Sequence, residues 1–470
     1  MPKLRIIKQN EEKTVPFTGT VLIRDILTEH GYVLPHLCGG RGTCKKCEVT
    51  ANGEKVLSCR HTVSEDTVLI LPDSEELSVS VGAEGSGIAT ENMHLCLDIG
   101  TTTVVLALAE ADSGTVVRSV TAANPQRTFG ADVISRIEHC MKSGVGKLRD
   151  VLVQRIAEMT AELLGKFGIK SIDRMYVSGN TTMLHIFRGV DPTPMGTAPY
   201  TPAFLGEVRS SGEACGLPQV REIVLLPGIS AFVGADILAG INYVGLPEDD
   251  RWRILLDLGT NAEIVLFSRE RILCTAAAAG PCFEGANISC GMSAADGAVY
   301  AVDENGRISV IGNVLPKGIC ATGLVDAIAY GLKHEIIEES GYMEDDELEL
   351  AEGVSLTQRD VREFQLAKSA IRAATECLVK RAGIELSKVE GLYVAGGFSA
   401  SLNAENAARV GLIPEELAEK LIGINNSSLL GAVRYAVCDG KGTIGSERAE
   451  YVDLSADAHF AGLFMEYMAF

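Results

Sequence analysis

The sequence predicts a mixed α/β protein of several domains, in which a small β-rich domain precedes a larger body that contains an internal repeat. Three observations lead to this prediction. Four cysteines gather in a glycine-rich stretch near the N-terminus, at Cys38, Cys44, Cys47 and Cys59. A strand–turn–strand pattern containing Asp-x-Gly-Thr occurs twice, about 160 residues apart. Between these two features, residues 74–92 contain few bulky apolar side chains, which is typical of a flexible linker.

Length and composition agree with such an organisation. The chain has 470 residues, of which 46% are hydrophobic and 22% charged. This is an ordinary globular composition, long enough for two to four domains. The formal net charge is −20, whereas residues 1–73 hold ten Lys and Arg against nine Asp and Glu. The remainder is therefore strongly acidic, and because an acidic surface repels nucleic acids and anionic lipids, we expect neither nucleic acid nor membrane as a partner.

The compartment is predicted from three negative features. The N-terminal residues lack the apolar core of a secretory signal. No uncharged apolar run reaches the roughly 18 residues of a membrane-spanning helix. The thirteen cysteines are mostly scattered singly, which fits a reducing environment. We therefore expect a cytoplasmic location.

Residues 1–73 are predicted to form the β-rich domain. Gly31 would end its helix, and Pro72 would stop its last strand. Asn52-Gly53 predicts a hairpin turn within the cysteine region. The expected elements are a strand at 4–9, turns at 11–13 and 18–20, a helix at 21–31 and a last strand at 67–71.

The cysteine loop can fold around an inorganic cluster. Its first three cysteines are spaced C-x5-C-x2-C, and eleven residues separate Cys47 from Cys59. Gly39, Gly40 and Gly42 let the backbone turn sharply without Cβ clashes. A zinc ribbon would need a second C-x2-C pair, and disulfides would need an oxidising compartment. Four buried structural cysteines would not gather in a glycine-rich loop.

This loop resembles the loop of ferredoxins that hold a [2Fe-2S] cluster by four cysteine thiolates. The Cys44–Cys47 pair and the separate fourth thiol match, whereas five residues instead of four follow the first cysteine and the gap before the last is much shorter. The resemblance implies that Cys38, Cys44, Cys47 and Cys59 ligate the cluster. The order strand, strand, helix, cysteine loop, strand is that of the ubiquitin-like ferredoxin fold, so residues 1–73 are expected to form a [2Fe-2S] ferredoxin-like domain.

The rest of the chain alternates strands with long helices. Leu148, Val151, Leu152 and Ile156 recur at helical spacing and predict a long amphipathic helix. The last 25 residues are aromatic enough to dock on the body. The expected elements are helices at 145–167 and 359–383, a strand with a Gly-Asn turn at 174–184, a small-residue loop at 276–292 and a buried strand at 389–400.

The two Asp-x-Gly-Thr turns point to phosphate. Amides and a hydroxyl in such a turn can cradle phosphate, and the carboxylate can hold Mg2+ through water. One such turn is often a plain β-turn, but two that face each other would grip the β/γ end of a nucleotide. The Gly396-Gly397 turn lets backbone lie against a ribose or adenine. The first grip consists of Asp98, Gly100, Thr101 and Thr102, and the second of Asp257, Gly259, Thr260 and Asn261.

These residues resemble the acetate and sugar kinase/heat-shock cognate/actin superfamily, abbreviated ASKHA, over roughly residues 93–445. The resemblance adds Thr103 to the first phosphate motif and Glu263 to the second, and assigns 395–398, with Gly396, Gly397 and Phe398, to the adenosine motif. It places 178–182 and 426–432 at the hinge. It implies two ribonuclease-H-like lobes with a nucleotide cleft between them, lobe I at 93–250 and lobe II, with a C-terminal docking tail, at 251–470.

A [2Fe-2S] domain fused to an ASKHA body resembles the reductive activators of corrinoid proteins found in anaerobes. The resemblance implies an ATP-dependent iron–sulfur reductase that passes one electron to inactive Co(II) and regenerates Co(I), with Asp98 and Asp257 as catalytic residues. The implied partners are a corrinoid protein of a methyltransferase system and a low-potential donor of ferredoxin or flavodoxin type. The chain departs from larger members in lacking their long linker and additional middle domain. Further matching stretches are 124–126, 129–136, 232–236, 280–291 and 318–324.

Three other functions remain open. An ASKHA small-molecule kinase with a fused redox sensor would need a catalytic Asp that faces a sugar hydroxyl, and no sugar-binding signature is evident. A nucleotide-gated binding module would never hydrolyse ATP. An activator of 2-hydroxyacyl-CoA dehydratases would hold a [4Fe-4S] cluster between subunits, and Cys282 and Cys290 are too isolated to indicate one.

Overall fold

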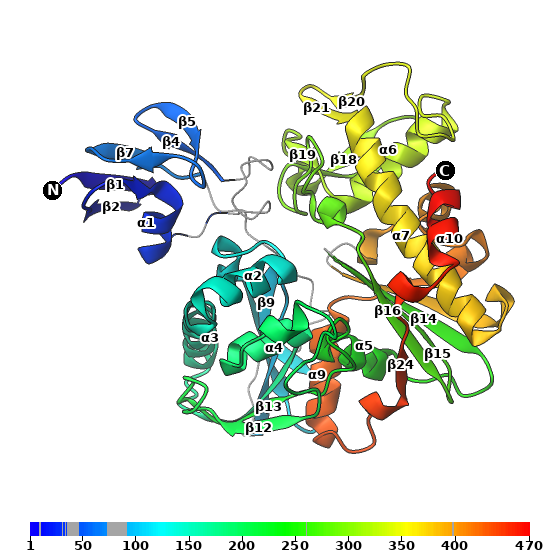
Figure 1. Ribbon diagram of the computed structural model, residues 1–470, viewed down its shortest axis with the longest axis horizontal. Coiled ribbons are helices and arrows are strands. Elements are labelled where there is room, and N and C mark those ends of the chain that lie inside the picture. The colour runs from blue at the N-terminus through cyan, green and yellow to red at the C-terminus, as the bar shows by residue number, and fades with distance from the viewer. Residues whose placement is uncertain are drawn as a thin grey trace.

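The computed structural model describes residues 1–8, 11–30, 32, 34, 47–72, 92–259, 261–396 and 399–470. Three main sheets, each with its own apolar core, organise these residues (Figure 1). The predicted ligands Cys38 and Cys44, and nearly all of the predicted linker, lie outside the described residues. Within the described residues, none of the helices combines the length and apolar content needed to span a bilayer.

The N-terminal sheet has five strands in the order β2-β1-β7-β4-β5, and its β1 and β7 run parallel. Helix α1 (Ile23–Glu29) buries Ile23 and Leu27 against Leu4 and Ile6 of β1. The small core of this domain is therefore separate from those of the lobes. Its strands are β1 (Lys3–Lys8), β2 (Glu11–Pro16), β3 (Val21–Leu22), β4 (Glu48–Ala51), β5 (Glu54–Leu57), β6 (Thr62–Val63) and β7 (Thr67–Ile70).

Local predictions in this domain had mixed outcomes. Asn52 and Gly53 both have positive φ, 49° and 88°, as the predicted hairpin turn between β4 and β5 requires. The predicted turn at 11–13 was wrong, because these polar residues begin β2 and pair with β1. The helix begins at Ile23 and not at residue 21, because Val21 pairs with Val63 of β6.

The two larger sheets share the arrangement of five strands, and the sixth strand of each lies at the opposite edge. Each begins with three antiparallel strands in a meander, a later strand pairs in parallel with the first strand, and a further strand pairs in parallel with that later strand. The first strands, β8 (Met93–Ile99) and β14 (Trp252–Leu258), therefore occupy equivalent central positions. The first order is β10-β9-β8-β11-β13-β12, from β8 (Met93–Ile99), β9 (Thr103–Glu110), β10 (Val116–Ala123), β11 (Ile172–Gly179), β12 (Val208–Ser211) and β13 (Val220–Leu225). The second is β23-β22-β14-β15-β16-β24, from β14 (Trp252–Leu258), β15 (Ala262–Phe267), β16 (Ile272–Ala277), β22 (Val389–Ala395), β23 (Leu421–Gly423) and β24 (Ala449–Tyr451).

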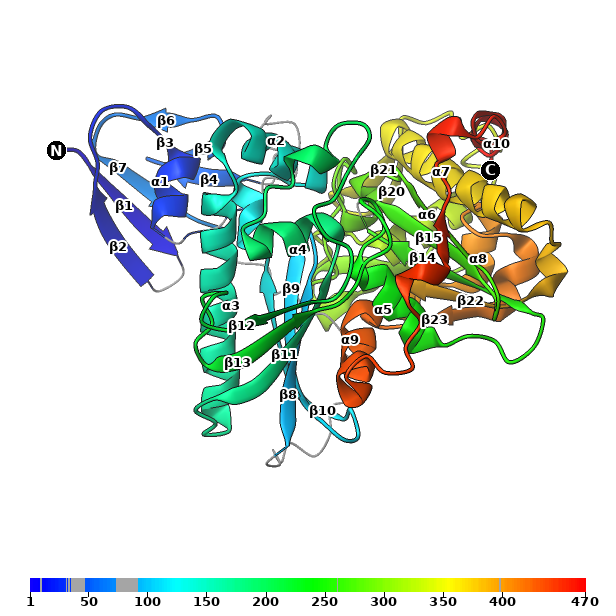
Figure 2. The same cartoon turned by 60° about the horizontal axis from the view of Figure 1, so that its bottom comes forward.

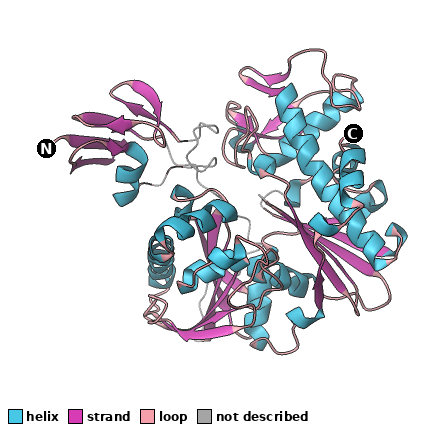
Figure 3. Cartoon of the chain, viewed as in Figure 1, coloured by secondary structure: helices cyan, strands magenta, loops and turns pink. Residues whose placement is uncertain are grey.

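Helices pack around these sheets, and the smaller strands lie together at one end of the second half of the chain (Figure 1 and Figure 3). The helices are α2 (Val133–Ser143), α3 (Gly146–Lys166), α4 (Thr181–Arg188), α5 (Ala235–Val244), α6 (Ala321–Lys333), α7 (Gln358–Ala382), α8 (Ala404–Arg409), α9 (Ser427–Cys438) and α10 (Phe460–Glu466). The smaller strands are β17 (Ala298–Val302), β18 (Ile308–Val310), β19 (Gly318–Ile319), β20 (Glu347–Ala351) and β21 (Val354–Thr357).

The long helix α7 forms much of the core of lobe II. Thr357 and Asp360 exchange side-chain-to-backbone hydrogen bonds in a capping box, which satisfies amides that the first turn would leave unpaired. Gly383, at φ 71°, ends the helix in the left-handed conformation. The C-terminal segment packs on this core through Phe464 and Phe470.

Helices α5 and α9 join the lobes and lie side by side (Figure 2). Helix α9 comes from the C-terminal part of the sequence, but its Leu429 lies in the core of lobe I. Helix α5 comes from the N-terminal part, but its Ile237 shares a core with Leu255 of β14. The helices can approach closely because residue 431 is a glycine. A Cβ at this position would lie only 2.1 Å from the carbonyl oxygen of Ala239.

Candidate functional site

A cleft of about 1080 Å3 lies between the lobes. This volume slightly exceeds the roughly 300–1,000 Å3 of most small-molecule sites. Thr260, Gly397 and Phe398 lie outside the described residues. The other residues predicted to bind or turn over a nucleotide all line this cleft, from separate sheets: Asp98, Gly100, Thr101, Thr102, Thr103, Asp257, Gly259, Asn261, Glu263 and Gly396.

Hydrogen bonds fix the conformation of the first phosphate turn, residues 100–103. The Gly100 amide donates to the Thr103 carbonyl at 2.9 Å, and a Cβ at Gly100 would lie only 2.7 Å from that oxygen, so this tight turn requires glycine. Asn124 donates to the Gly100 carbonyl at 2.8 Å, and Asn180 donates to the Thr101 hydroxyl at 3.0 Å. The turn therefore has little freedom to rearrange.

Arg136 places a positive charge behind the same turn. Its guanidinium is fully buried and donates to the carbonyls of Thr101 and Gly130 and to the side-chain oxygen of Gln126. These acceptors are uncharged. Burial and the neighbouring Arg127 lower the pKa of Arg136 to about 9, so the group stays charged at neutral pH. The charge favours an anion at the first turn.

Asp98, near the end of β8, is held by two side chains at the start of α9. Asn426 Nδ2 donates to Asp98 Oδ2 at 2.8 Å, and Ser428 Oγ donates to Asp98 Oδ1 at 2.7 Å. Ser428 also lies 2.9 Å from Ser178 Oγ. Burial raises the pKa of Asp98, and the hydrogen bonds from Ser428 and Asn426 oppose that rise. The carboxylate therefore has a fixed orientation at the cleft.

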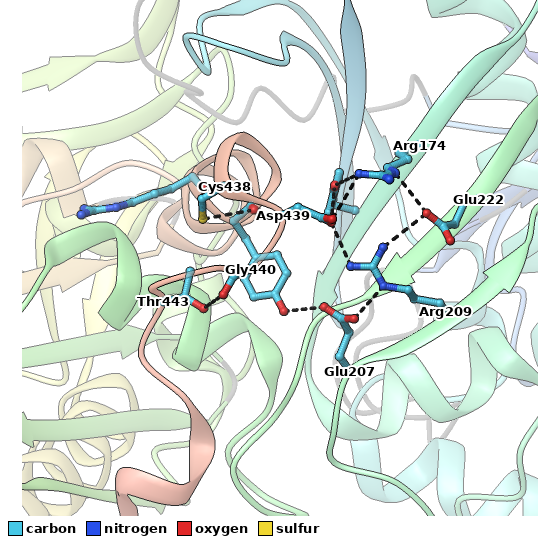
Figure 4. Close-up of polar contacts among 11 residues, drawn as sticks. Arg174, Glu207, Arg209, Glu222, Cys438, Asp439, Gly440 and Thr443 are labelled. Carbon is cyan, nitrogen blue, oxygen red and sulfur yellow. Dashed lines mark hydrogen bonds and ion pairs between the residues drawn. The ribbon is translucent and has the colours of Figure 1, made fainter.

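The far end of α9 is anchored to the sheet of lobe I by a polar network (Figure 4). Asp439 caps the helix at φ 49° and accepts hydrogen bonds from Tyr176 and Arg209, each at 2.9 Å. Arg174 lies 3.3 Å from Asp439 and 3.0 Å from Glu222 of β13. Because both ends of α9 are fixed, its first turn can present Asn426 and Ser428 to Asp98.

Three further carboxyl groups face the cleft. Burial, with a contribution from Asp98, raises the pKa of Asp257 to about 6. Burial, with contributions from Asp257 and Asp98, raises the pKa of Asp236 to about 8. Burial likewise raises the pKa of Glu263 well above its usual value. Asp236 was not predicted as a site residue; its position in the first turn of α5, directly after Gly234-Ala235, was the available signal.

Glu284 is the second cleft residue that sequence reasoning missed. Its Oε2 accepts a hydrogen bond from Thr102 Oγ1 at 3.1 Å, so it joins lobe II to the first turn. The loop 276–292 was expected to pack through small residues, and the lone carboxylate within it was the available signal. Among the described residues, no group of three or more His, Cys, Asp or Glu side chains could by itself hold a metal ion.

These pKa values predict a pH-dependent stability. The carboxyls of Asp236 and Asp257 keep their protons to about pH 8 and about pH 6 when folded, but release them near pH 4 when unfolded. Their contribution to stability is therefore fully present below about pH 4 and is lost as the pH rises through these folded values. In the wild type we expect the thermal unfolding midpoint to fall between pH 5 and pH 8. In Asp236→Asn we expect a smaller fall over the same range, measured without nucleotide by scanning calorimetry. Asp345→Asn, at an exposed position, is the matched control, and an unchanged slope in Asp236→Asn would contradict the assignment.

Two of the four predicted cluster ligands are described, and they lie at one end of the β4–β5 hairpin. Cys47 immediately precedes β4 and Cys59 follows β5, and the Ser58 amide donates to the Cys47 carbonyl at 3.0 Å. Both thiols are buried and neither forms a disulfide. Two thiols gathered at one hairpin end fit a thiolate-bound cluster. Burial raises the pKa of the Cys282 thiol, which disfavours the thiolate that a ligand requires.

Comparison with family models gives two adjoining matches. A model described as the RACo middle region matches residues 93–249, and one described as the C-terminal domain of RACo, the ASKHA domain, matches residues 251–470. The middle-region model matches the stretch predicted as lobe I, and the expected absence of a domain additional to the two lobes stays a prediction.

Two curated proteins and one solved structure are similar along much of the chain. The corrinoid activation enzyme RamQ of Eubacterium limosum is 28% identical over an alignment of 584 positions, gaps included, which covers 98% of each chain. The reductase of the Co(II) methylated amine-specific corrinoid protein of Methanosarcina barkeri is 28% identical over 375 residues, 71% of this chain and 68% of its own. The structure of a reductive activator for a corrinoid, iron-sulfur protein has 25% identity and a TM-score of 0.71, and the match covers 99% of this chain and 98% of that one.

Proposed function

Because the chain belongs to the RACo family and its body is an ASKHA domain, we propose that it is an ATP-dependent reductive activator of a corrinoid protein. In this reaction one electron converts inactive Co(II) of the partner to Co(I). The observation that carries the proposal is the likeness, along nearly the whole chain, to a reductive activator for a corrinoid, iron-sulfur protein. The corrinoid protein would belong to a methyltransferase system, and a low-potential ferredoxin or flavodoxin would supply electrons.

The cleft is proposed to bind ATP with Mg2+. The amides and hydroxyls of 100–103 and 259–261 would hold the phosphates, and 396–398 would lie against the adenosine. Asp98 and Asp257, from opposite lobes, would hold Mg2+ through water or orient the attacking water. Mg2+ keeps several waters and uses substrate phosphates as ligands, so two carboxylates suffice and a complete protein cage is not needed. Glu263 would add a further polar side chain to the cleft beside the second phosphate turn.

The N-terminal residues 1–73 are proposed to be the ferredoxin-like domain, joined by a linker at 74–92 to lobes at 93–250 and 251–470, except that α9 of the second stretch packs in the core of lobe I. Cys38, Cys44, Cys47 and Cys59 would hold a [2Fe-2S] cluster. That group supplies a one-electron carrier, near −400 mV in plant-type ferredoxins. For one electron, about 59 mV corresponds to about 1.4 kcal/mol. Binding that favours Co(I)-type coordination by about 4 kcal/mol would raise the cobalt couple by roughly 170 mV.

The proposal predicts that ATP increases the formation of Co(I) and that the corrinoid protein increases ATP turnover. The pure chain, a strong reductant and a Co(II) corrinoid protein are mixed anaerobically, and the Co(I) absorption band is followed with and without ATP. We expect Co(I) to accumulate with ATP, and ATP turnover to rise when the corrinoid protein is present. A corrinoid-free protein of similar charge is the control. ATP turnover that responds to a small sugar and not to any corrinoid protein would favour the kinase instead.

A further inference from the structure

Glu284 lies between the two phosphate turns. Its Oε2 accepts from Thr102 Oγ1 of the first turn at 3.1 Å. A Cβ placed on Gly259 of the second turn would lie 3.7 Å from Glu284 Oε1. The carboxylate therefore stands at the position where both turns would meet the end of a nucleotide.

The backbone around Glu284 is packed in the core of lobe II. Glu284 ends the short helix η3 (Pro281–Glu284), in which Cys282 and Phe283 are 2% and 4% exposed within the core of lobe II. Gly285 reverses the chain at φ 75°, and a Cβ on it would lie 2.6 Å from the Met292 amide nitrogen. The hydrogen bond to Thr102 is therefore a contact between lobes, and it breaks if the lobes separate or the side chain turns away.

The carboxylate and a terminal phosphate would compete for the same partners. Thr102 has one hydroxyl hydrogen, which cannot serve both anions at once. The buried guanidinium of Arg136 attracts whichever anion lies at the first turn, and it already interacts electrostatically with Glu284. A γ-phosphate placed beside Glu284 would also meet a like charge. A diphosphate, which lacks the γ-phosphate, leaves Thr102 to the carboxylate.

We propose that Glu284 is the residue by which the cleft distinguishes ATP from ADP. The proposal rests on the nucleotide site of the proposed function and deepens it. The γ-phosphate of ATP displaces Glu284 from Thr102 and breaks this contact between the lobes, whereas ADP leaves the contact in place. Water then attacks the γ-phosphorus and releases a proton to solvent, the bond to the ADP oxygen breaks, and release of inorganic phosphate lets Glu284 return to Thr102. Hydrolysis is thereby coupled to the contact between lobes.

The test compares two nucleotides on the full chain by calorimetric titration with Mg2+. In the wild type, part of the binding energy of ATP is used to displace Glu284 from Thr102. Glu284→Gln and Glu284→Ala should therefore bind a non-hydrolysable ATP analogue about tenfold more tightly than the wild type. This difference corresponds to about 1.4 kcal/mol. Their ADP affinity should stay within about twofold of the wild type. Glu416→Gln, at an exposed position of lobe II, is the matched control.

Each other outcome has a distinct meaning. Equal gains for ATP analogue and ADP, or a changed turnover rate with unchanged affinities, would overturn the inference but leave the nucleotide site standing. Failure of the wild-type chain to bind either nucleotide would overturn the proposed function and the inference together. Unfolding midpoints measured without nucleotide identify a variant that has lost its fold, and Glu284→Gln preserves the shape of the side chain.

Discussion

Cys47→Ala and Cys59→Ala should each abolish formation of Co(I) while ATP still binds. Each variant removes one of the four thiolates proposed to hold the cluster, so we expect loss of iron, of the visible charge-transfer absorption and of the paramagnetic signal of the reduced protein. The nucleotide cleft should survive because it lies between the lobes, whose cores are separate from that of the N-terminal domain. Iron content, absorption, electron paramagnetic resonance and nucleotide titration measure these effects.

Cys290→Ala is the matched control for the cysteine variants, since Cys290 is partly exposed in lobe II and far along the chain from the proposed cluster loop. It should keep iron and Co(I) formation. One zinc and no iron in anaerobically purified wild-type protein would reject the cluster. A normal rate of Co(I) formation by Cys47→Ala would show that the electron follows another route, and the first domain would then be a sensor or a docking module.

Asp98→Asn and Asp257→Asn should each lower Mg-dependent ATP turnover by roughly a hundredfold or more, the usual scale when a group that stabilises developing charge is lost. Asn cannot replace a carboxylate that holds Mg2+ through water or orients the attacking water. Asp98→Asn should also disturb the hydrogen bonds from Asn426 and Ser428. Steady-state phosphate release at saturating ATP gives the turnover rate.

Thermal stability separates catalysis from folding in these variants. Because burial disfavours the ionised form of Asp257, a neutral amide there should not lower the unfolding midpoint of the nucleotide-free protein by much. Asp98→Asn should lower it more, because its amide nitrogen would face a hydrogen-bond donor, either Asn426 or Ser428. Asp345→Asn, at an exposed position, should change neither turnover nor stability. Full ATP turnover in both cleft variants would mean that the nucleotide site lies elsewhere.

Features set by neighbouring residues could be predicted from the sequence alone. The Asn52-Gly53 turn requires two positive φ angles, which these residue types favour. The first Asp-x-Gly-Thr turn closes through a hydrogen bond from Gly100 to Thr103, within three positions. The repeat of this pattern, through its resemblance to the ASKHA superfamily, predicted two lobes, and the two sheets do share the order of five strands, with the sixth at opposite edges.

Features set by distant residues were decided only by the tertiary structure. The polar residues at 11–13 form a strand because β1 lies beside them. Helix α9 could be assigned to lobe I only after its apolar face was seen to pack there. Glu284 meets Thr102 across 182 positions, and Asn426 meets Asp98 across 328. No local pattern encodes such pairs, because they depend on how two separately folded sheets face each other, and that same arrangement buries Asp236 and raises its pKa.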